Sequence, residues 1–268
     1  MKVAVGQFAV QPEWRANAAT CIKLMQEATG QGARLLVLPE AVLARHNTDP
    51  EWGINAAQPL DGEFVAMLLE ASRGSGLTTV LTIHTPESDG RVFNTLLAIR
   101  EGEMIAHYHK LHLYDAFNFQ ESVRVTAGRL LPPLIDVAGM KVGLMTCYDL
   151  RFPDLALRLA LAGAEVIAMP AAWVRGAHKE HHWATLLAAR ALDTTCYLVA
   201  SGECGVKNIG CSRVISPMGV TLAAADEQPA LFYAELSAQR LAEVRKQLPV
   251  LTNRRFRLPE LAENERLT

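Results

Sequence analysis

Three side chains with types suited to nucleophilic catalysis each follow a segment of strand-like, apolar sequence. They are Glu40, Lys110 and Cys147. In α/β sheets, reactive groups gather at the carboxyl ends of strands. Cys147 is followed by a short turn and by Pro153, which suits the first turn of a helix. We therefore expect the three side chains to lie at one edge of a sheet, with Cys147 exposed on a strand-to-helix turn.

A thiol, a carboxylate and an ammonium group together suit attack on a carbonyl or nitrile carbon. The thiolate is the nucleophile, and the carboxylate takes the thiol proton and later activates water. The ammonium group and the backbone N–H after Cys147 stabilise the oxyanion. We expect the adjacent helix end and a nearby cation to lower the pKa of the thiol below about 8.5. Each residue also has an ordinary alternative as a core cysteine, a surface glutamate or a solvated lysine.

The composition narrows the class of protein that presents these groups. The chain has 268 residues, is 50% hydrophobic and has a formal net charge of −2. One α/β domain can reach roughly 250 residues, and the near-neutral charge argues against a general nucleic-acid binder. No apolar run approaches the roughly 20 residues that cross a bilayer, so we expect no membrane partner. The five scattered cysteines form no CxxC pair, which predicts a cytoplasmic protein without a disulfide framework.

Short runs of Val, Ile and Leu alternate with helical patterns, which predicts an α/β fold without a linker. A glycine turn joins 92–99 to 104–109 as a hairpin. Late in the chain, 213–215, 220–224 and 231–236 resemble the strands of a meander. The other predicted strands are 3–10, 34–38, 78–83, 141–146, 165–169 and 196–200, and the predicted helices are 17–29, the segment from Asp61 to Leu69, 153–162, 178–194 and 238–247.

The two halves of the chain resemble each other. LLVLPEA at 35–41 is similar to VIAMPAA at 166–172, and KVAVG at 2–6 is similar to KVGL at 141–144. The matches leave open whether the repeat is real or a coincidence among apolar strands. A real repeat predicts two sheets packed face to face with helices outside, a four-layer α-β-β-α sandwich.

Three motifs in this order resemble the nitrilase superfamily of carbon–nitrogen hydrolases over nearly the whole chain. They are LVLPE at 36–40, YHKLHLYD at 108–115 and GLMTCYDLRFP at 143–153, and His182-Trp183 and Arg190-Ala191 also match. The resemblance implies one four-layer domain over 1–268 with a short C-terminal tail.

The same resemblance implies a role for four residues. Glu40 is the expected general base, Lys110 the oxyanion stabiliser and Cys147 the nucleophile. Glu121 is expected to orient Lys110 or to assist protonation of the leaving group.

Within the superfamily, the chain is most similar to amidases of the Nit branch. The similarity rests on CYDLRFP at 147–153, Cys196-Tyr197 and the stretch 247–255. It implies a small-molecule amide substrate with a 2-oxo acid end, no cofactor and a homodimer. The connection from Lys110 to Glu121 is shorter than is usual in omega-amidases, which leaves the preferred amide open.

A substrate carboxylate requires a cationic partner, and a guanidinium group binds carboxylate through two parallel hydrogen bonds. Arg151, four residues after the nucleophile, is the first candidate, although an ion pair with Asp149 or Asp154 is an equal alternative. Arg175 is a second candidate, for which a solvated loop position is favoured over contact with substrate. Trp173, Tyr148 and His182 complete the predicted substrate-binding set.

Two other classes of protein remain as alternatives. His107 with His109, and His178 with His182, have spacings found in metal sites. However, Lys179 stands where an HExxH motif requires glutamate, so no metal is expected. A non-catalytic binding protein of the same fold is the other alternative. The short basic tail at Arg254, Arg255 and Arg257 is interpreted as a packing or subunit contact, without nucleic acid.

Overall fold

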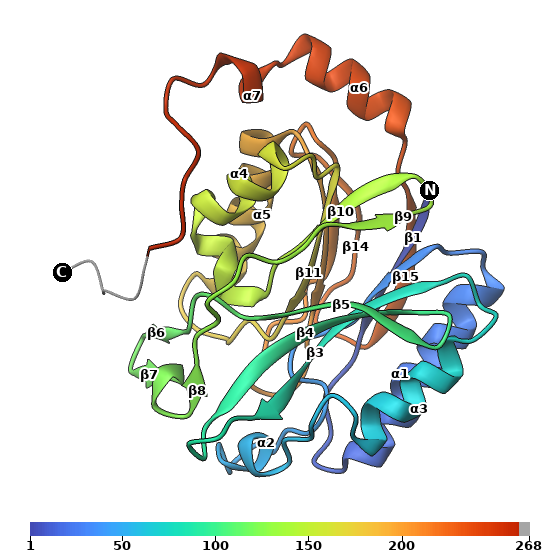
Figure 1. Cartoon of the computed structure of the whole chain (residues 1–268), viewed down its shortest axis with the longest axis vertical. Helices are drawn as coiled ribbons and strands as arrows, with labels where there is room; N and C mark the ends of the chain where they lie inside the picture. The colour runs from blue at the N-terminus through green and yellow to red at the C-terminus, as the bar shows by residue number, and fades with distance from the viewer. Residues whose placement is uncertain (263–268) are drawn as a thin grey trace.

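Two β-sheets packed face to face form the centre of the computed structural model, which describes residues 1–262 (Figure 1). The first sheet contains, in spatial order, β15 (Ala230–Glu235), β1 (Lys2–Gln7), β2 (Leu35–Val37), β3 (Thr78–Pro86), β4 (Val92–Arg100) and β5 (Glu103–His109), with β8 (Val125–Thr126) beside β4. The second contains β14 (Thr221–Ala224), β13 (Arg213–Ile215), β12 (Tyr197–Gly202), β11 (Val166–Ala171), β10 (Met140–Leu144) and β9 (Ile135–Val137).

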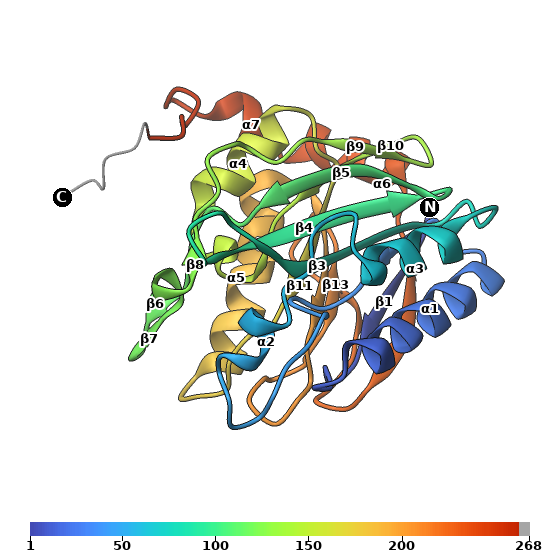
Figure 2. The ribbon, with the colours of Figure 1, turned by 60° about the horizontal axis from the view of Figure 1, so that its bottom comes forward.

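Helices cover the outer face of each sheet, which confirms the predicted four-layer sandwich (Figures 1 and 2). On the first sheet lie α1 (Trp14–Gly30) and α3 (Glu63–Ser72), and on the second α4 (Pro153–Leu161) and α5 (Lys179–Thr194). The remaining elements are α2 (Trp52–Asn55), the hairpin β6 (Asp115–Ala116) and β7 (Phe119–Gln120), the 3-10 turns η1 (Glu121–Val123) and η2 (Cys147–Arg151), α6 (Ala238–Gln247) and α7 (Val250–Asn253).

The elements follow from simple sequence patterns. All three residues of β2 are buried, as expected for an apolar strand between two layers. The inner face of α5 carries buried side chains at Trp183, Leu187 and Ala191, one or two helical turns apart. The hairpin between β4 and β5 turns at Glu101 and Gly102, whose φ angles are 53° and 81°. Glycine adopts this left-handed conformation without steric cost.

The strand order favours a real internal repeat. In the first sheet, the parallel strands β1, β2 and β3 are flanked by antiparallel β15 and β4. In the second, parallel β10, β11 and β12 are flanked by antiparallel β9 and β13. The carboxyl ends of β2 and β11 meet, because the Glu40 N–H donates a hydrogen bond to the Ala171 carbonyl at 3.3 Å. Two corresponding segments of the halves therefore lie side by side.

The predicted late meander is wrong at its last strand. β13 and β14 pair with each other, but β15 crosses to the first sheet and pairs antiparallel with β1, from Lys2 opposite Glu235 to Gln7 opposite Ala230. Without β15, β1 would present an edge of unpaired backbone groups, and covering such an edge is favourable. The local sequence predicts a strand there but contains no information about its partner.

The ends of the chain add little to this core. Residues 263–268 of the predicted 1–268 domain lie outside the described residues, and the preceding tail extends beyond α7 (Figure 1). Within 1–262, none of the helices combines the length and the apolar character that crossing a membrane requires.

Candidate active site

The Glu40 carboxylate lies at the junction of the two sheets. Its Oε1 accepts hydrogen bonds from Asn94 Nδ2 at 2.7 Å and from Lys110 Nζ at 3.0 Å. Its Oε2 accepts one from the backbone N–H of Ala172 at 2.8 Å. Asn94 belongs to β4 and Ala172 follows β11, so both sheets fix the orientation of one carboxylate.

Lys110 follows β5 and lies between two carboxylates. Besides its bond to Glu40, its Nζ donates to Glu121 Oε2 at 2.9 Å and to Glu121 Oε1 at 3.1 Å. Glu121 is held in turn by the backbone N–H of Tyr114, which donates to Oε2 at 2.6 Å. The ammonium group is therefore fixed at three oxygen atoms.

The charges in this cluster stabilise one another. Burial acts to lower the pKa of Lys110, but the carboxylates of Glu121 and Glu40 raise that pKa well above its usual range. Burial acts to raise the pKa of Glu40, but the Lys110 ammonium, the hydrogen bond with the Cys147 thiol and the Arg45 guanidinium together hold that pKa below its ordinary value. Glu40 is thus a carboxylate at neutral pH, in the form that accepts a proton.

Cys147 begins η2 shortly after the end of β10 and has a left-handed backbone conformation, with φ at 43°. Non-glycine residues with positive φ are uncommon and concentrate at functional sites. The turn is organised by the buried carboxylate of Asp149, whose Oδ2 accepts hydrogen bonds from the Thr146 N–H at 3.0 Å and from Tyr108 Oη at 2.9 Å. Its Oδ1 accepts the backbone N–H of His112 at 3.0 Å. The position of the thiol therefore depends on the buried hydrogen-bond network around the Asp149 carboxylate.

The expectation of a lowered thiol pKa is wrong. Burial and the nearby Glu40 carboxylate raise the pKa of Cys147 well above its usual range, and Lys110 opposes them only in part. The thiol is protonated at rest because a thiolate would add a second negative charge beside Glu40. A protonated thiol needs a base at the moment of attack, and the Glu40 carboxylate is within hydrogen-bonding distance of it.

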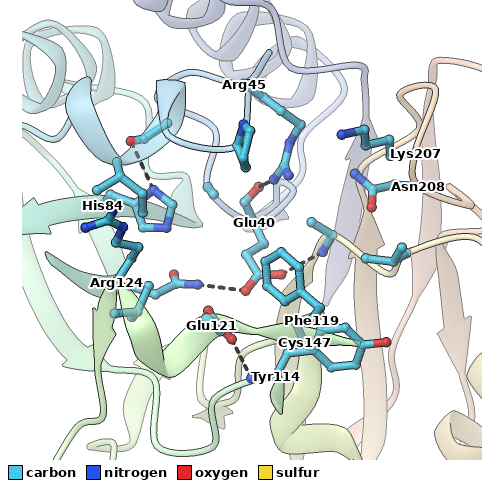
Figure 3. Close-up of a pocket in the computed structure, with 18 of the residues that line it drawn as sticks. Glu40, Arg45, His84, Tyr114, Phe119, Glu121, Arg124, Cys147, Lys207 and Asn208 are labelled. Atoms are coloured by element: carbon cyan, nitrogen blue, oxygen red, sulfur yellow. Dashed lines mark hydrogen bonds between the residues drawn. The ribbon is translucent and has the colours of Figure 1, made fainter. Parts of the chain in front are cut away.

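These groups line a cavity of about 570 Å³ (Figure 3). In Figure 3, Glu40 lies between Arg45 and Cys147. Of the residues predicted for the site, Glu40, Lys110, Glu121, Cys147, Tyr148 and Trp173 line this cavity.

Arg151, His182 and Arg175 are not among the residues that line it. The Arg151 guanidinium lies 4.9 Å from the centroid of the Trp173 ring, and its Nη2 contacts His182 Nδ1 at 3.3 Å. Arg175 Nη2 pairs with Glu227 at 3.2 Å on the surface, and Arg175 borders a small neighbouring pocket. Direct substrate contact by these three residues stays a prediction.

Other polar lining residues were not expected from the sequence. Asn94 lies within a strand pattern that carries no sign of function, and Arg45 and His84 follow no motif. Lys179 was considered only as the residue that breaks an HExxH spacing. These four residues come from a loop, from β3 and β4 and from the start of α5, so only folding brings them to one cavity. The missed residues are Arg45, His84, Asn94 and Lys179.

In the described part of the chain, the pairs His107 with His109 and His178 with His182 are not joined by further metal-binding side chains. Within residues 1–262, no group of three or more His, Cys, Asp or Glu side chains is placed to hold a metal ion. His109 Nδ1 instead contacts the Thr95 hydroxyl at 2.9 Å, and its ring stacks on Phe93 with 4.0 Å between the centroids.

The arrangement combines a protonated thiol, an ionised carboxylate and a fixed ammonium group in one cavity. Such a set can transfer the thiol proton to Glu40 as sulfur attacks a carbonyl carbon. Lys110 and the backbone N–H of Tyr148 are suitable donors for the oxygen that becomes negative. The chemistry is nucleophilic substitution at an acyl or nitrile carbon.

Comparisons with known proteins agree with this chemistry. Residues 2–246 match the carbon–nitrogen hydrolase family model. A protein of Escherichia coli O157:H7 named deaminated glutathione amidase is 59% identical over 261 residues, which cover 97% of this chain and 100% of that protein.

Two solved structures share the fold. The Caenorhabditis elegans NitFhit protein has a TM-score of 0.88 at 29% identity over 95% of this chain, which spans 65% of that longer chain. Saccharomyces cerevisiae Nit3, a member of branch 10 of the nitrilase superfamily, has a TM-score of 0.81 at 26% identity, with 96% of this chain and 97% of that chain covered. The protein described here therefore belongs to the carbon–nitrogen hydrolase family, within the nitrilase superfamily.

Proposed function

We propose that this enzyme is a cysteine-dependent amidase that hydrolyses deaminated glutathione to 2-oxoglutarate and cysteinylglycine. The reaction type is carried by one observation, the meeting of the Cys147 thiol, the Glu40 carboxylate and the Lys110 ammonium in one cavity. The choice of substrate is supported by the 59% identity to the Escherichia coli amidase over nearly the full length of both chains.

The first half of the reaction forms a thioester. Cys147 Sγ attacks the amide carbonyl carbon while its proton passes to Glu40. Lys110 and the Tyr148 N–H hold the oxygen of the tetrahedral intermediate. The intermediate then collapses, the C–N bond breaks, and Glu40 returns the proton to the leaving amine, so that cysteinylglycine departs and the 2-oxoglutaryl group remains on sulfur.

The second half consumes water. Glu40 takes a proton from a water molecule that attacks the thioester carbon, and the same oxyanion donors stabilise the second tetrahedral intermediate. Collapse breaks the C–S bond, and the proton held by Glu40 returns to the sulfur. Glu121 holds the Lys110 ammonium in position throughout, because it accepts two of its hydrogen bonds.

The aromatic residues Tyr148 and Trp173 are proposed to border the acyl group, because both line the cavity beside Cys147. Arg151 and His182 are proposed to support this border from behind the Trp173 ring, where the two side chains contact each other. Arg175 is proposed to act only at the mouth, next to its partner Glu227.

The decisive experiment compares kcat/KM for deaminated glutathione and for 2-oxoglutaramate, the substrate of omega-amidases. The Cys147→Ala protein serves as the blank, with circular dichroism to show that it is folded. We expect hydrolysis of both amides to require Cys147 and deaminated glutathione to be preferred. A preference for 2-oxoglutaramate would assign the enzyme to the omega-amidases instead, and activity on neither would overturn the proposed substrate.

Two statements about the protein in its cell belong to the same proposal. We propose a homodimer, on the basis of the family resemblance and of apolar side chains such as Phe256, which is 89% exposed on the tail. We propose a cytoplasmic location, supported by five free cysteines that a reducing compartment would preserve. Light scattering on the purified protein tests the first, and fractionation of the cells that make it tests the second.

A further inference from the structure

Two cationic side chains line the cavity, Arg45 and Lys179. Arg45 and Tyr114, the hydrogen-bond partner of Lys179, lie on opposite sides of Glu40 in Figure 3. We call the region of Cys147, Trp173 and Lys179 the thiol side, and the region of Glu40, Arg45 and His84 the acid side. All six residues line the cavity. Neither Lys179 nor Arg45 forms an ion pair with any carboxylate of residues 1–262.

Lys179 on the thiol side is 4% exposed, and its Nζ donates one hydrogen bond, to Tyr114 Oη at 2.7 Å. The rings of Phe117, Tyr114 and Trp173 surround it, with centroids 4.2, 4.8 and 5.6 Å from Nζ. It is also the first residue of α5, where the helix dipole disfavours a positive charge. Burial and the neighbouring Arg151 lower the pKa of Lys179. An anion bound in the cavity would relieve each of these costs.

Arg45 on the acid side likewise has no anionic partner in the part of the chain that the structure describes. Its Nε is buried with no hydrogen-bond partner, and its Nη2 makes only a long contact of 3.5 Å with the Glu40 carbonyl. The nearby His84 is neutral, because burial and Arg45 lower its pKa to about 4, and its Nδ1 contacts the Gly53 carbonyl at 3.2 Å. The Arg45 guanidinium therefore has hydrogen-bonding capacity directed at the cavity.

The other charged residues on this side are already engaged or lie at the mouth. Glu51 pairs with Arg124 at 2.9 Å, and Asp49 Oδ1 accepts the Glu51 backbone N–H at 2.9 Å. Lys207 is exposed at the rim. Among residues 1–262, Arg45 is thus a cation that contacts Glu40 on the acid side and has no anionic partner.

We infer that the cavity recognises an amide with a carboxylate at each end, with Lys179 binding the acyl carboxylate and Arg45 binding the carboxylate of the leaving amine. The acyl carbon becomes bonded to Cys147, which places the rest of the acyl group on the thiol side. The amine takes its proton from Glu40, which places the leaving group on the acid side. The two cations therefore sit where the two ends of such a substrate must lie.

This inference rests on the proposed function and makes it more specific. Deaminated glutathione carries a carboxylate at both ends, whereas 2-oxoglutaramate releases ammonia and carries only the acyl carboxylate. Arg45 is therefore a specificity-determining residue for the leaving group alone, and Lys179 serves both substrates.

The test measures kcat/KM for three substrates: deaminated glutathione, its analogue with the glycine carboxylate converted to a carboxamide, and 2-oxoglutaramate. We expect Arg45→Met to lower kcat/KM for deaminated glutathione about 10- to 100-fold, mainly through KM, because one charge-assisted contact is lost. The carboxamide analogue should lose a similar factor with the unaltered enzyme and little more with Arg45→Met, since both changes remove the same contact. Arg45→Lys should restore part of the loss.

The ratio of kcat/KM for deaminated glutathione to kcat/KM for 2-oxoglutaramate distinguishes two effects of Arg45→Met. Loss of the contact with the leaving-group carboxylate lowers the ratio, whereas indirect damage to Glu40 lowers both values together and leaves the ratio unchanged. Lys179→Met should lower both rates by a similar factor. Lys207→Met, which removes a charge only at the rim, should leave the ratio within about twofold. An unchanged ratio in Arg45→Met overturns the inference while leaving the proposed amidase intact. Absence of activity on deaminated glutathione in the unaltered enzyme overturns the proposed function itself.

Discussion

Lys110 controls the charge of the reacting groups because it is shared between two carboxylates. With Glu40 and Glu121 ionised, the cluster carries one net negative charge, and a resting thiolate at Cys147 would raise it to two. The raised pKa of the thiol follows from this arrangement. The proton must therefore leave the thiol during attack rather than before it.

Replacing Lys110 or Glu121 distinguishes stabilisation of the oxyanion by Lys110 from the positioning of its ammonium group by Glu121. Lys110→Ala should lower kcat by at least about 10²–10³, the cost of losing one oxyanion donor. Glu121→Gln should cost less, because the bond from Lys110 to Glu40 remains. Steady-state kinetics on deaminated glutathione, with thermal denaturation as a check on folding, measures both effects. Near-normal activity of Lys110→Ala would contradict the proposed role of the ammonium group.

The pKa shifts also predict a broad pH profile. The pKa of Glu40 is held below its ordinary value of 4.5, so the base stays ionised through neutral pH, and kcat/KM should fall only below that value. The raised pKa of Cys147 places the alkaline limb above its ordinary value of 9.0. The stabilising contribution of the ionised Glu40 is likewise present above its unfolded pKa and lost as the pH falls through the folded one. An acid limb near neutral pH would contradict this assignment.

The residues that could be predicted from the sequence follow strands directly. Glu40, Lys110 and Cys147 each come at or just after a strand end, where topology alone brings reactive groups together. Asn94 and Lys179 could not be predicted, because one lies inside a strand and the other begins a helix against the preference of its dipole. Their significance depends on which element faces them across the cavity.

At the scale of elements, the turn from β10 into η2 is held by buried hydrogen bonds. The capping box between Thr146 and Asp149 closes the turn, and Tyr108 from β5 donates its hydroxyl proton to Asp149 Oδ2 at 2.9 Å while its oxygen lies 2.8 Å from Thr146 Oγ1. The strand that precedes Lys110 thereby supports the turn that carries Cys147. The ammonium group and the thiol are positioned by one connected unit.

Tyr108→Phe tests this connection without touching the cavity. Loss of a hydrogen bond to a buried charged group should cost about 1.5–3 kcal/mol of unfolding free energy, and the loosened turn should also lower kcat. Urea denaturation and kinetics measure the two effects. Tyr197→Phe is the matched control, because its hydroxyl bonds to the Ser237 carbonyl at 3.2 Å far from the turn. Equal kcat values in both variants would show that the network is only structural.

The partner of each strand was harder to predict than its existence. The apolar runs at β2 and β11 were sufficient to identify buried strands, because each is covered on both faces. The crossing of β15 to β1 depends on which sheet edge is free after the two halves have packed. The local pattern of alternating residues in a strand contains no information about which distant strand it will pair with.

At the scale of the whole molecule, the two halves of the chain contribute different parts of the site. Glu40 and Lys110 come from the first half and Cys147 from the second, while β15 returns from the second half to complete the first sheet. Leu130, in the connection between the halves, is 79% exposed.

Cutting the chain after Leu130 should therefore give two fragments that are each inactive. Mixed or produced together, they should recover part of the activity, because β15 and the sheet interface hold them together. Kinetics on the reassociated sample, with Cys147→Ala in the second fragment as the control, measures the recovery. Activity in the first fragment alone would contradict the assignment of the nucleophile.

The hydrogen bond between Glu40 and Ala171 has a further consequence. In the alignment of the halves, Ala171 is the counterpart of Glu40, and Phe8 is the counterpart of Cys147. Because the backbones of these two counterparts are hydrogen-bonded to each other at the sheet junction, a second base at position 171 would lie beside Glu40 and not in a separate site. Phe8 also stands where a second thiol would be required, so each chain can hold one acyl group at a time.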